Sequence, residues 1–152
     1  MDDVPSASSS AIWHDPLSLD ALNTMGEGNM GAHLDIRFTE VGPDFLRASM
    51  PVDERTRQPF GLLHGGASVV LAETVGSVAA NACVDLDACY CVGVEVNANH
   101  LRPVREGRVT ATARPLHRGR STQVWQIHIR NEAGTLICAS RLTVAVVTRA
   151  EK

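Results

Sequence analysis

The chain has 152 residues, 44% of them hydrophobic and 20% charged, which is typical of one globular domain that buries a core without disulfides or metals. Its net charge of −3 argues against binding nucleic acid, because phosphate surfaces reward clustered positive charge. No apolar run approaches the roughly 20 residues that cross a bilayer, so we expect no membrane partner either.

The first eleven residues are acidic and rich in serine, and they lack the basic and apolar regions of a signal peptide. We predict a disordered tail over residues 1–11 and a single domain over residues 12–149. Cys89 and Cys91 lack the Cys-x-x-Cys spacing of zinc sites, and the six histidines are scattered. We therefore expect no metal, reduced cysteines and a cytoplasmic protein.

The chain then alternates between short predicted elements and turns. Residues 18–23 predict a short helix capped by Ser18, which Gly26, Gly28 and Gly31 would end. Residues 34–39 and 45–52 predict two strands, joined by a turn at residues 41–44.

Residues 65 to about 80 are the only candidate for a long helix. Its predicted core-facing side consists of Val70, Leu71, Thr74 and Val78. The opposite side consists of Val69, Glu73, Ser77 and Ala80, with the carboxylate and the hydroxyl one turn apart.

After the helix the hydrophobic pattern changes to the period of two that is typical of strands. Four strands are predicted, around residues 91–97, 109–114, 124–130 and 136–147, the last of them interior to the sheet. Most strands therefore follow one substantial helix. This order predicts an α+β fold in which an antiparallel sheet packs around that helix.

Glu73 is the first candidate for chemistry. It could be a solvated surface glutamate, but Val69, Gly76 and Ala80 make a poor solvent face around it. A carboxylate in such surroundings could act as a nucleophile or as a general base, and the residues alone leave both open.

The segment His64-Gly65-Gly66 is the second candidate, because it begins the predicted helix. A single histidine in a loop is more often structural than catalytic. The glycines, however, allow close approach of a ligand, and the Gly65 N–H could polarise an acyl carbonyl. Gln58 could position this loop or contact a carbonyl or water; otherwise it is a surface amide.

The basic residues of the C-terminal half lie mostly at strand ends and turns, where a solvated rim is the ordinary interpretation. If several converged, they would bind the phosphates of a nucleotide-bearing ligand. These residues are Arg102, Arg105, Arg108, Arg118, Arg120 and Arg149. Dinucleotide, Walker, zinc-protease and serine-hydrolase motifs are absent from the sequence. The remaining interpretation is acyl transfer or hydrolysis around Glu73.

The segment Gln58-Pro-Phe-Gly-Leu-Leu-His-Gly-Gly-Ala-Ser68, with Glu73 nine residues after His64, resembles the hotdog-fold acyl-CoA thioesterases. It is similar to the branch that holds the Arthrobacter-type 4-hydroxybenzoyl-CoA, 1,4-dihydroxy-2-naphthoyl-CoA and enterobactin-pathway proofreading thioesterases. Further matching segments are residues 25–30, 50–53, 95–100, 115–117 and 123–125. The resemblance spans roughly residues 12–147 and implies a curved antiparallel sheet wrapped around one long helix.

The resemblance also implies roles for the residues of the motif. Glu73 would be the nucleophile or general base, and the Gly65 N–H would polarise the thioester carbonyl. His64 and Gln58 would orient the acyl carbonyl or the leaving thiolate. Ser77 would place the hydrolytic water.

The substrate implied is an acyl-CoA thioester with an aromatic acyl group; an acyl carrier protein thioester is an alternative. CoA is part of the substrate, so no cofactor is expected. The implied CoA-binding residues are His100, Arg102, Arg120, Ser121 and Thr122, and the acyl pocket is expected at Met25, Phe60 and Leu63. The implied assembly is a homotetramer, a dimer of dimers with active sites at the dimer interface.

Two other functions remain open at this point. A hotdog dehydratase acting on 3-hydroxyacyl thioesters also pairs a histidine with a carboxylate. A non-catalytic acyl-CoA binding module on the same fold would need neither the carboxylate nor the hydroxyl.

Overall fold

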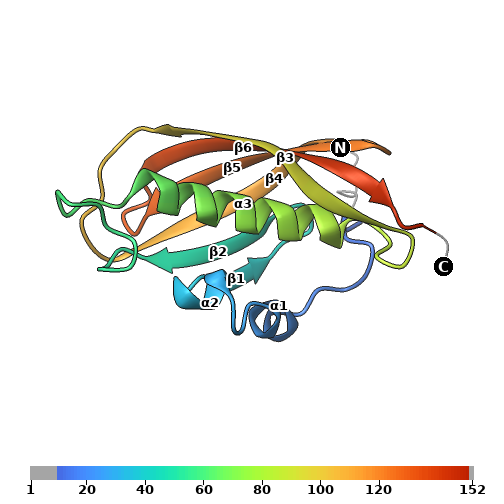
Figure 1. The fold of residues 1–152 in the computed structure, drawn as a ribbon, viewed down its shortest axis with the longest axis horizontal. Helices are drawn as coiled ribbons and strands as arrows, with labels where there is room; N and C mark the ends of the chain where they lie inside the picture. Colours follow the sequence, from blue (N-terminus) through green and yellow to red (C-terminus); the bar gives the residue numbers. More distant parts are fainter. Residues whose placement is uncertain (1–9, 151–152) are drawn as a thin grey trace, which may run out of the picture.

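One long helix lies against a six-stranded antiparallel sheet in the computed structural model, which describes residues 10–150 (Figure 1). The helix is α3 (Gly65–Ala82), and the sheet order is β1-β2-β4-β5-β6-β3. The strands are β1 (Arg37–Val41), β2 (Leu46–Pro51), β3 (Cys89–His100), β4 (Arg108–Arg118), β5 (Thr122–Asn131) and β6 (Leu136–Thr148). The predicted α+β fold is confirmed. Most of the predicted tail, residues 1–9, falls outside the described residues.

Small side chains line the face of α3 that meets the sheet. Its buried residues are Ser68, Leu71, Ala72, Val75, Gly76, Ala79 and Ala80. The predicted core stripe was therefore wrong except at Leu71, since Val70, Thr74 and Val78 are only half-buried. The sheet curves around the helix, so small residues such as Ala72, Gly76 and Ala79 make the closest contact, whereas Val70, Thr74 and Val78 lie on the flanks. A Cβ on Gly76 would lie only 2.7 Å from Leu142 Cδ2.

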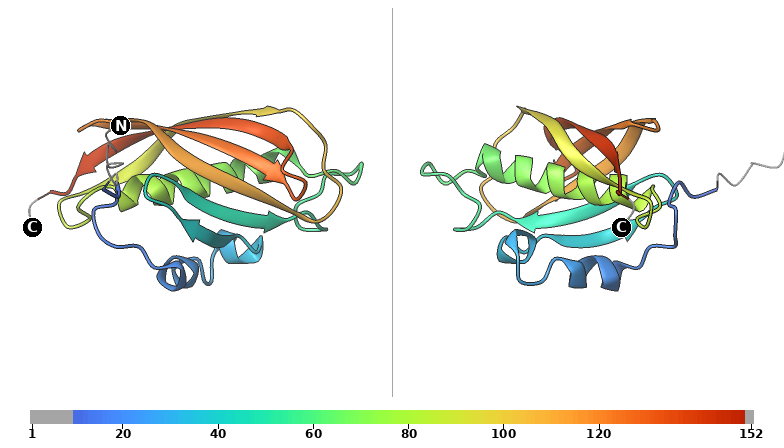
Figure 2. Two further views of the ribbon diagram at one scale, coloured as in Figure 1. Left: turned by 180° about the vertical axis from the view of Figure 1, so that it is seen from behind. Right: turned by 45° about the vertical axis from the view of Figure 1, so that its right-hand side comes forward.

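The N-terminal segment packs below β1 as two short helices, α1 (Leu19–Met25) and α2 (Met30–His33) (Figure 2). The predicted cap at Ser18 is confirmed, because its hydroxyl accepts the Ala21 N–H at 3.4 Å. Helix α2 was not predicted, and it delays the first strand to Arg37. Asp35, between them, has a positive φ of 51°, which an extended strand cannot accommodate.

The core lies between the sheet and α3. Inward-facing side chains alternate along β4 and β5 as predicted, and Trp125, Ile127 and Ile129 are fully buried. β6 is an interior strand, paired with β5 on one side and β3 on the other.

Strand β3 stands at one end of the sheet, and among the described residues it pairs only with β6. Val92 and Val94 are 41% and 66% exposed on this edge strand. The pairing shifts register between Gly93 and Glu95. An exposed edge with apolar side chains is a surface on which another strand can pair.

The four cysteines are free thiols, and Cys91 and Cys138 are buried. Burial raises the pKa of the Cys91 thiol to about 11, so it is protonated at neutral pH. No helix within residues 10–150 combines the length and apolarity that a membrane crossing requires.

Candidate active site

Helix α3 begins at the predicted motif, and His64 is its N-cap residue. The His64 Nδ1 atom accepts the Gly66 N–H at 2.8 Å, which satisfies one of the donors that a helix start leaves unpaired. Because Nδ1 is the acceptor, the neutral ring carries its proton on Nε2. The side chain of His64 therefore shapes the helix start in this structure.

The N–H of Gly65 remains available at the same helix start. No acceptor within residues 10–150 binds it, whereas the Ala67 N–H donates to the His64 carbonyl at 3.0 Å. The His100 imidazole lies directly against Gly65, since a Cβ there would lie 2.9 Å from His100 Nε2. Only glycine leaves this N–H and its surroundings open to a ligand.

The loop before the helix is held by its own backbone. The Leu63 N–H donates to Val104 O at 2.7 Å, and the His64 N–H donates to Thr56 O at 2.8 Å. The Gln58 Oε1 atom accepts the Phe60 N–H, so the Gln58 side chain braces the turn at whose tip Phe60 lies 83% exposed.

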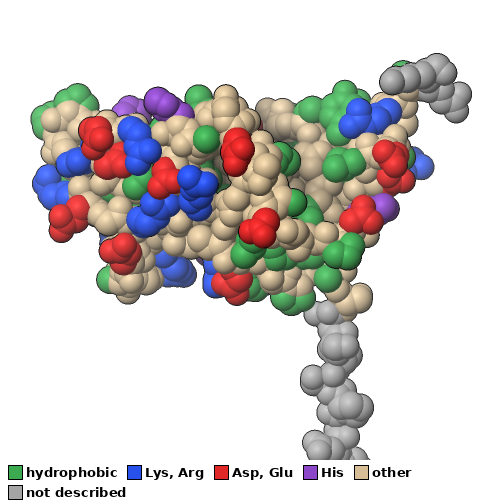
Figure 3. Space-filling view, turned by 90° about the horizontal axis from the view of Figure 1, so that it is seen from below, with side chains coloured by type: hydrophobic (Ala, Val, Ile, Leu, Met, Phe, Trp, Pro, Cys, Tyr) green, Lys and Arg blue, Asp and Glu red, His purple; other side chains and the backbone are tan. Residues whose placement is uncertain are grey.

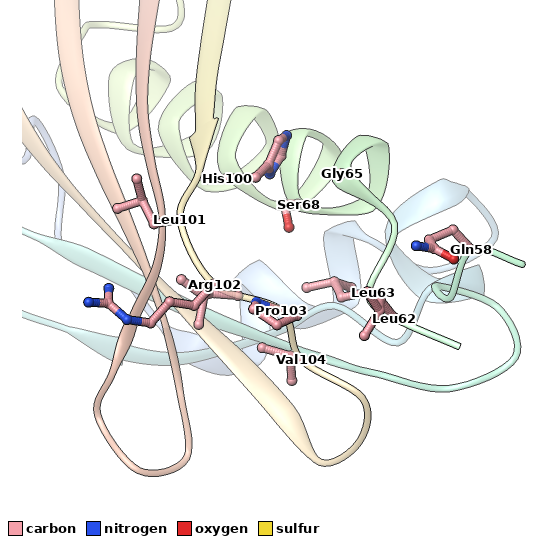
Figure 4. A pocket seen from close by; sticks show the side chains of 11 residues that line it. Gln58, Leu62, Leu63, Gly65, Ser68, His100, Leu101, Arg102, Pro103 and Val104 are labelled. Carbon is pink, nitrogen blue, oxygen red and sulfur yellow. The ribbon is translucent and has the colours of Figure 1, made fainter. Parts of the chain in front are cut away.

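A cavity of about 340 Å³ opens in front of the Gly65 N–H (Figure 4). Predicted residues lining it are Gln58, Leu63, Gly65, His100 and Arg102. Figure 4 shows the Arg102 side chain extending away from the others; its guanidinium donates to Leu136 O at 3.1 Å. The structure thus brings together five predicted site residues that come from two segments of the chain, residues 58–65 and 100–102.

Ser68 also lines this cavity, and sequence reasoning missed it. It is 2% exposed and lies one helical turn after His64. A polar serine on the buried side of an apolar helix would have indicated a site residue. The wrong helix face was predicted to be buried, so Ser68 was not selected.

Glu73 lies elsewhere on α3, away from this cavity. Its Oε1 atom sits over Gly93 of β3, so close that a Cβ at Gly93 would lie 2.6 Å from it. Eight residues separate Glu73 from Gly65, which is about 12 Å along the helix axis. Within one protomer, the carboxylate and the Gly65 N–H therefore do not meet at one carbonyl group.

Ser77 lines a second cavity, of about 530 Å³, together with Met25. Leu63 belongs to the first cavity, and Phe60 lines neither. One protomer thus separates the three residues predicted for the acyl pocket.

The predicted CoA-binding residues also fall into two groups. His100 is paired with Cys138 of β6, whereas Thr122 is paired with Ala145. Seven residues of β6 separate these positions, or about 23 Å. Arg120, Ser121 and Thr122 therefore lie at the opposite end of the sheet from His100 and Arg102.

Acidic side chains accompany many of the basic ones on the molecular surface. On the face drawn in Figure 3, blue and red side chains are interspersed. Arg108 and Arg114, for example, form ion pairs with Asp35 at 3.0 Å and Asp44 at 2.6 Å. Within residues 10–150, no group of three or more His, Cys, Asp or Glu side chains is placed to hold a metal ion.

Known proteins resemble this chain over most of its length. The model of the thioesterase superfamily matches residues 60–138. The 1,4-dihydroxy-2-naphthoyl-CoA hydrolase of Escherichia coli K12 is 59% identical over 136 residues, which cover 90% of this chain and 99% of that protein. A proofreading thioesterase of Cronobacter turicensis, EntH, is 48% identical over 90% of this chain and 98% of its own length.

Solved structures agree with these relatives. A mutant thioesterase from Pseudomonas aeruginosa superposes with a TM-score of 0.90 at 53% identity, covering 91% of this chain and 100% of that one. A thioesterase from Haemophilus influenzae gives a TM-score of 0.89 at 49% identity, covering 92% and 97%. This chain therefore belongs to the thioesterase superfamily, has the hotdog fold and is a thioester hydrolase.

Proposed function

We propose that this protein hydrolyses aromatic acyl-CoA thioesters at sites shared between two protomers. The observation that carries the proposal is the division of α3 into an open N–H donor at Gly65 and a carboxylate at Glu73 two turns later. A thioester carbonyl is already electrophilic. One oriented carboxylate and one backbone donor therefore suffice for its hydrolysis, without a metal or another cofactor.

The Gly65 N–H would donate to the thioester carbonyl oxygen and stabilise the negative charge that develops there. The positive end of the α3 dipole strengthens this donor. Glu73 would then act in one of two ways. As a general base it takes a proton from water, whose oxygen attacks the carbonyl carbon. As a nucleophile it forms a mixed anhydride, which water then cleaves. In both cases the C–S bond breaks, and the CoA thiolate leaves and takes up a proton.

Two protomers would supply these groups to one substrate. Glu73 lies beside Gly93 and Gly65 beside His100, and these partners are seven residues apart on β3. Antiparallel pairing of two β3 edges would bring Glu73 of one chain towards Gly65 of the other. The exposed Val92 and Val94 on that edge support such pairing.

The same pairing would bring the two separated groups of predicted CoA-binding residues to one substrate. His100 and Arg102 would contact CoA from the chain that supplies Gly65. Arg120, Ser121 and Thr122, at the other end of the sheet, would contribute from the partner chain. We extend the proposal to a homotetramer built from two such dimers, and the four free thiols support a cytoplasmic location.

The first test measures release of CoA thiol from benzoyl-, 4-hydroxybenzoyl- and naphthoyl-CoA. The variant Glu73→Gln keeps the shape of the side chain and removes its charge. We expect kcat to fall at least about a hundredfold. Near-normal turnover by Glu73→Gln would show that the carboxylate is not used.

The second test mixes two inactive variants. Gly65→Pro removes the N–H at a helix position where proline is tolerated, and its melting temperature and size-exclusion profile check that it still folds and assembles. A mixed dimer of Gly65→Pro and Glu73→Gln chains holds one shared site with both groups intact. Random mixing should restore about a quarter of wild-type activity. No recovery in a verified mixed dimer would place both groups within one chain.

A further inference from the structure

The cavity that contains Ser77 is the larger of the two cavities described above, at about 530 Å³. It lies between α1, the C-terminal half of α3 and the beginning of β3. Leu17, Leu22, Met25 and Val78 give it an apolar wall. Its volume is in the range of small-molecule sites, which combine apolar walls with a few polar groups.

This cavity continues the face of α3 on which the proposed chemistry takes place. Ser77 lies one turn after Glu73, and Asn81, two turns after Glu73, also lines the cavity. Asn81 Nδ2 donates to Cys91 O at 3.1 Å and its Oδ1 accepts the Cys91 N–H at 2.8 Å, which fixes the end of α3 against β3. The path from Glu73 to Asn81 is about 12 Å along the helix, longer than a single benzoyl ring.

Arg149 stands at the rim of this cavity and is held from several directions. Its backbone N–H donates to Ala88 O at 2.9 Å, and its Nε donates to Leu86 O at 2.7 Å. The guanidinium lies over the Tyr90 ring, 5.1 Å from the ring centroid. Figure 1 shows that β6 and α3 end on the same side of the molecule.

Arg149 forms no ion pair with any side chain in the part of the chain that the structure describes. Among the described residues no carboxylate lies within 4.0 Å of it, although Asp85 and Asp87 flank Leu86. With Nε bound to the Leu86 carbonyl, the two terminal amino groups of Arg149 donate to no acceptor within residues 10–150. An anchored guanidinium with free donors at an apolar cavity matches an oxygen acceptor on a ligand.

We propose that Arg149 and Tyr90 recognise an acceptor or anionic oxygen at the far end of the acyl group. The preferred acyl group would then be an extended aromatic one, such as two fused rings, with an oxygen substituent distant from the thioester. The inference rests on the proposed thioesterase site, because it requires the acyl group to extend from Glu73 past Ser77. Arg149 acts here as a specificity determinant and takes no part in bond breaking.

The test compares two esters of equal ring size, 6-carboxy-2-naphthoyl-CoA and 6-methyl-2-naphthoyl-CoA. The readout is the ratio of their kcat/KM values, which a general loss of folded enzyme does not change. The wild type should favour the carboxylate ester at least about tenfold, and Arg149→Met should abolish this preference. Arg141→Met, which removes an exposed charge on the outer face of the sheet, is the matched control and should keep the ratio.

The possible results distinguish a failure of the specificity proposal from a failure of the proposed thioesterase function. Equal hydrolysis of both esters by the wild type, or an unchanged ratio in Arg149→Met, overturns the role of Arg149. A variant that is less stable and slower on both esters alike shows only that Arg149 fastens the C-terminal segment, which also overturns it. If the wild type releases CoA from neither ester nor from benzoyl-CoA, the proposed function itself fails.

Discussion

Replacing Gly93 with alanine should slow the proposed reaction by displacing the Glu73 carboxylate, without replacing Glu73 itself. A Cβ at this position would lie 2.6 Å from Glu73 Oε1, whereas ordinary contacts begin at 3.4 Å. The carboxylate must therefore retreat by about 0.8 Å, and misplacement of a reacting group by about 1 Å can cost a hundredfold in rate. Because the obstacle is the end of a flexible side chain, the fold should tolerate the new methyl group.

We expect Gly93→Ala to lower kcat by a factor of roughly 30 to 100, with a nearly unchanged melting temperature. Release of CoA thiol from an aromatic acyl-CoA measures the rate, and size-exclusion chromatography checks the assembly, since Gly93 lies on edge strand β3. The control is a double-mutant cycle with Glu73→Ala. If Gly93→Ala costs as much rate in that background as in the wild type, the effect does not pass through Glu73 and the reasoning is refuted.

Three further predictions concern stability and reactivity. Gly76→Ala should destabilise the fold by about 1–3 kcal/mol in urea unfolding, because its Cβ would meet Leu142 at 2.7 Å. Hydrogen bonds, first from Arg37 and then from Arg108, lower the pKa of Asp35. The ionised carboxylate therefore stabilises the fold above about pH 4, and this contribution disappears as the pH falls through the folded pKa. Asp35→Asn should lower the melting temperature at pH 7 more than at pH 3. Burial raises the pKa of the Cys91 thiol from 9.0 to about 11, which lowers its thiolate fraction at pH 8 about a hundredfold. Iodoacetamide should therefore alkylate Cys91 about a hundredfold more slowly in the native than in the urea-unfolded protein. Equal rates would contradict this.

The sequence predicted the order and type of the main elements, because their hydrophobic periods differ so clearly. Ser18 and the glycine-rich start at Gly65 also marked the beginnings of two helices. Helix α2 was not predicted because it has only four residues and contains Gly31, and glycine destabilises a helix interior. Single-helix periodicity chose the wrong core face for α3, since it weights large valines over the small residues that a curved sheet selects.

The sequence indicated candidate residues for the site but not how they are arranged in space. Spacing along the chain indicated that His64, Gly65 and Glu73 belong to one helix, yet it could not show that His64 caps that helix. His100 reaches Gly65 only because β3 and the segment after it pass beside the start of α3. Such long-range contacts depend on strand order, which no local pattern in the sequence encodes.

The position of Glu73 follows from the packing of α3 rather than from the motif around it. Gly76 lets the helix approach Leu142 closely, and Gly93 leaves space on β3 for the carboxylate above it. Gly76 and Gly93, far apart in the sequence, thus together determine how closely the Glu73 side chain lies against edge strand β3. That edge is also where we propose that a second chain pairs, so the same packing that places Glu73 would present it to the partner's Gly65. A substitution that lifts α3 from the sheet should therefore impair catalysis before it unfolds the protein.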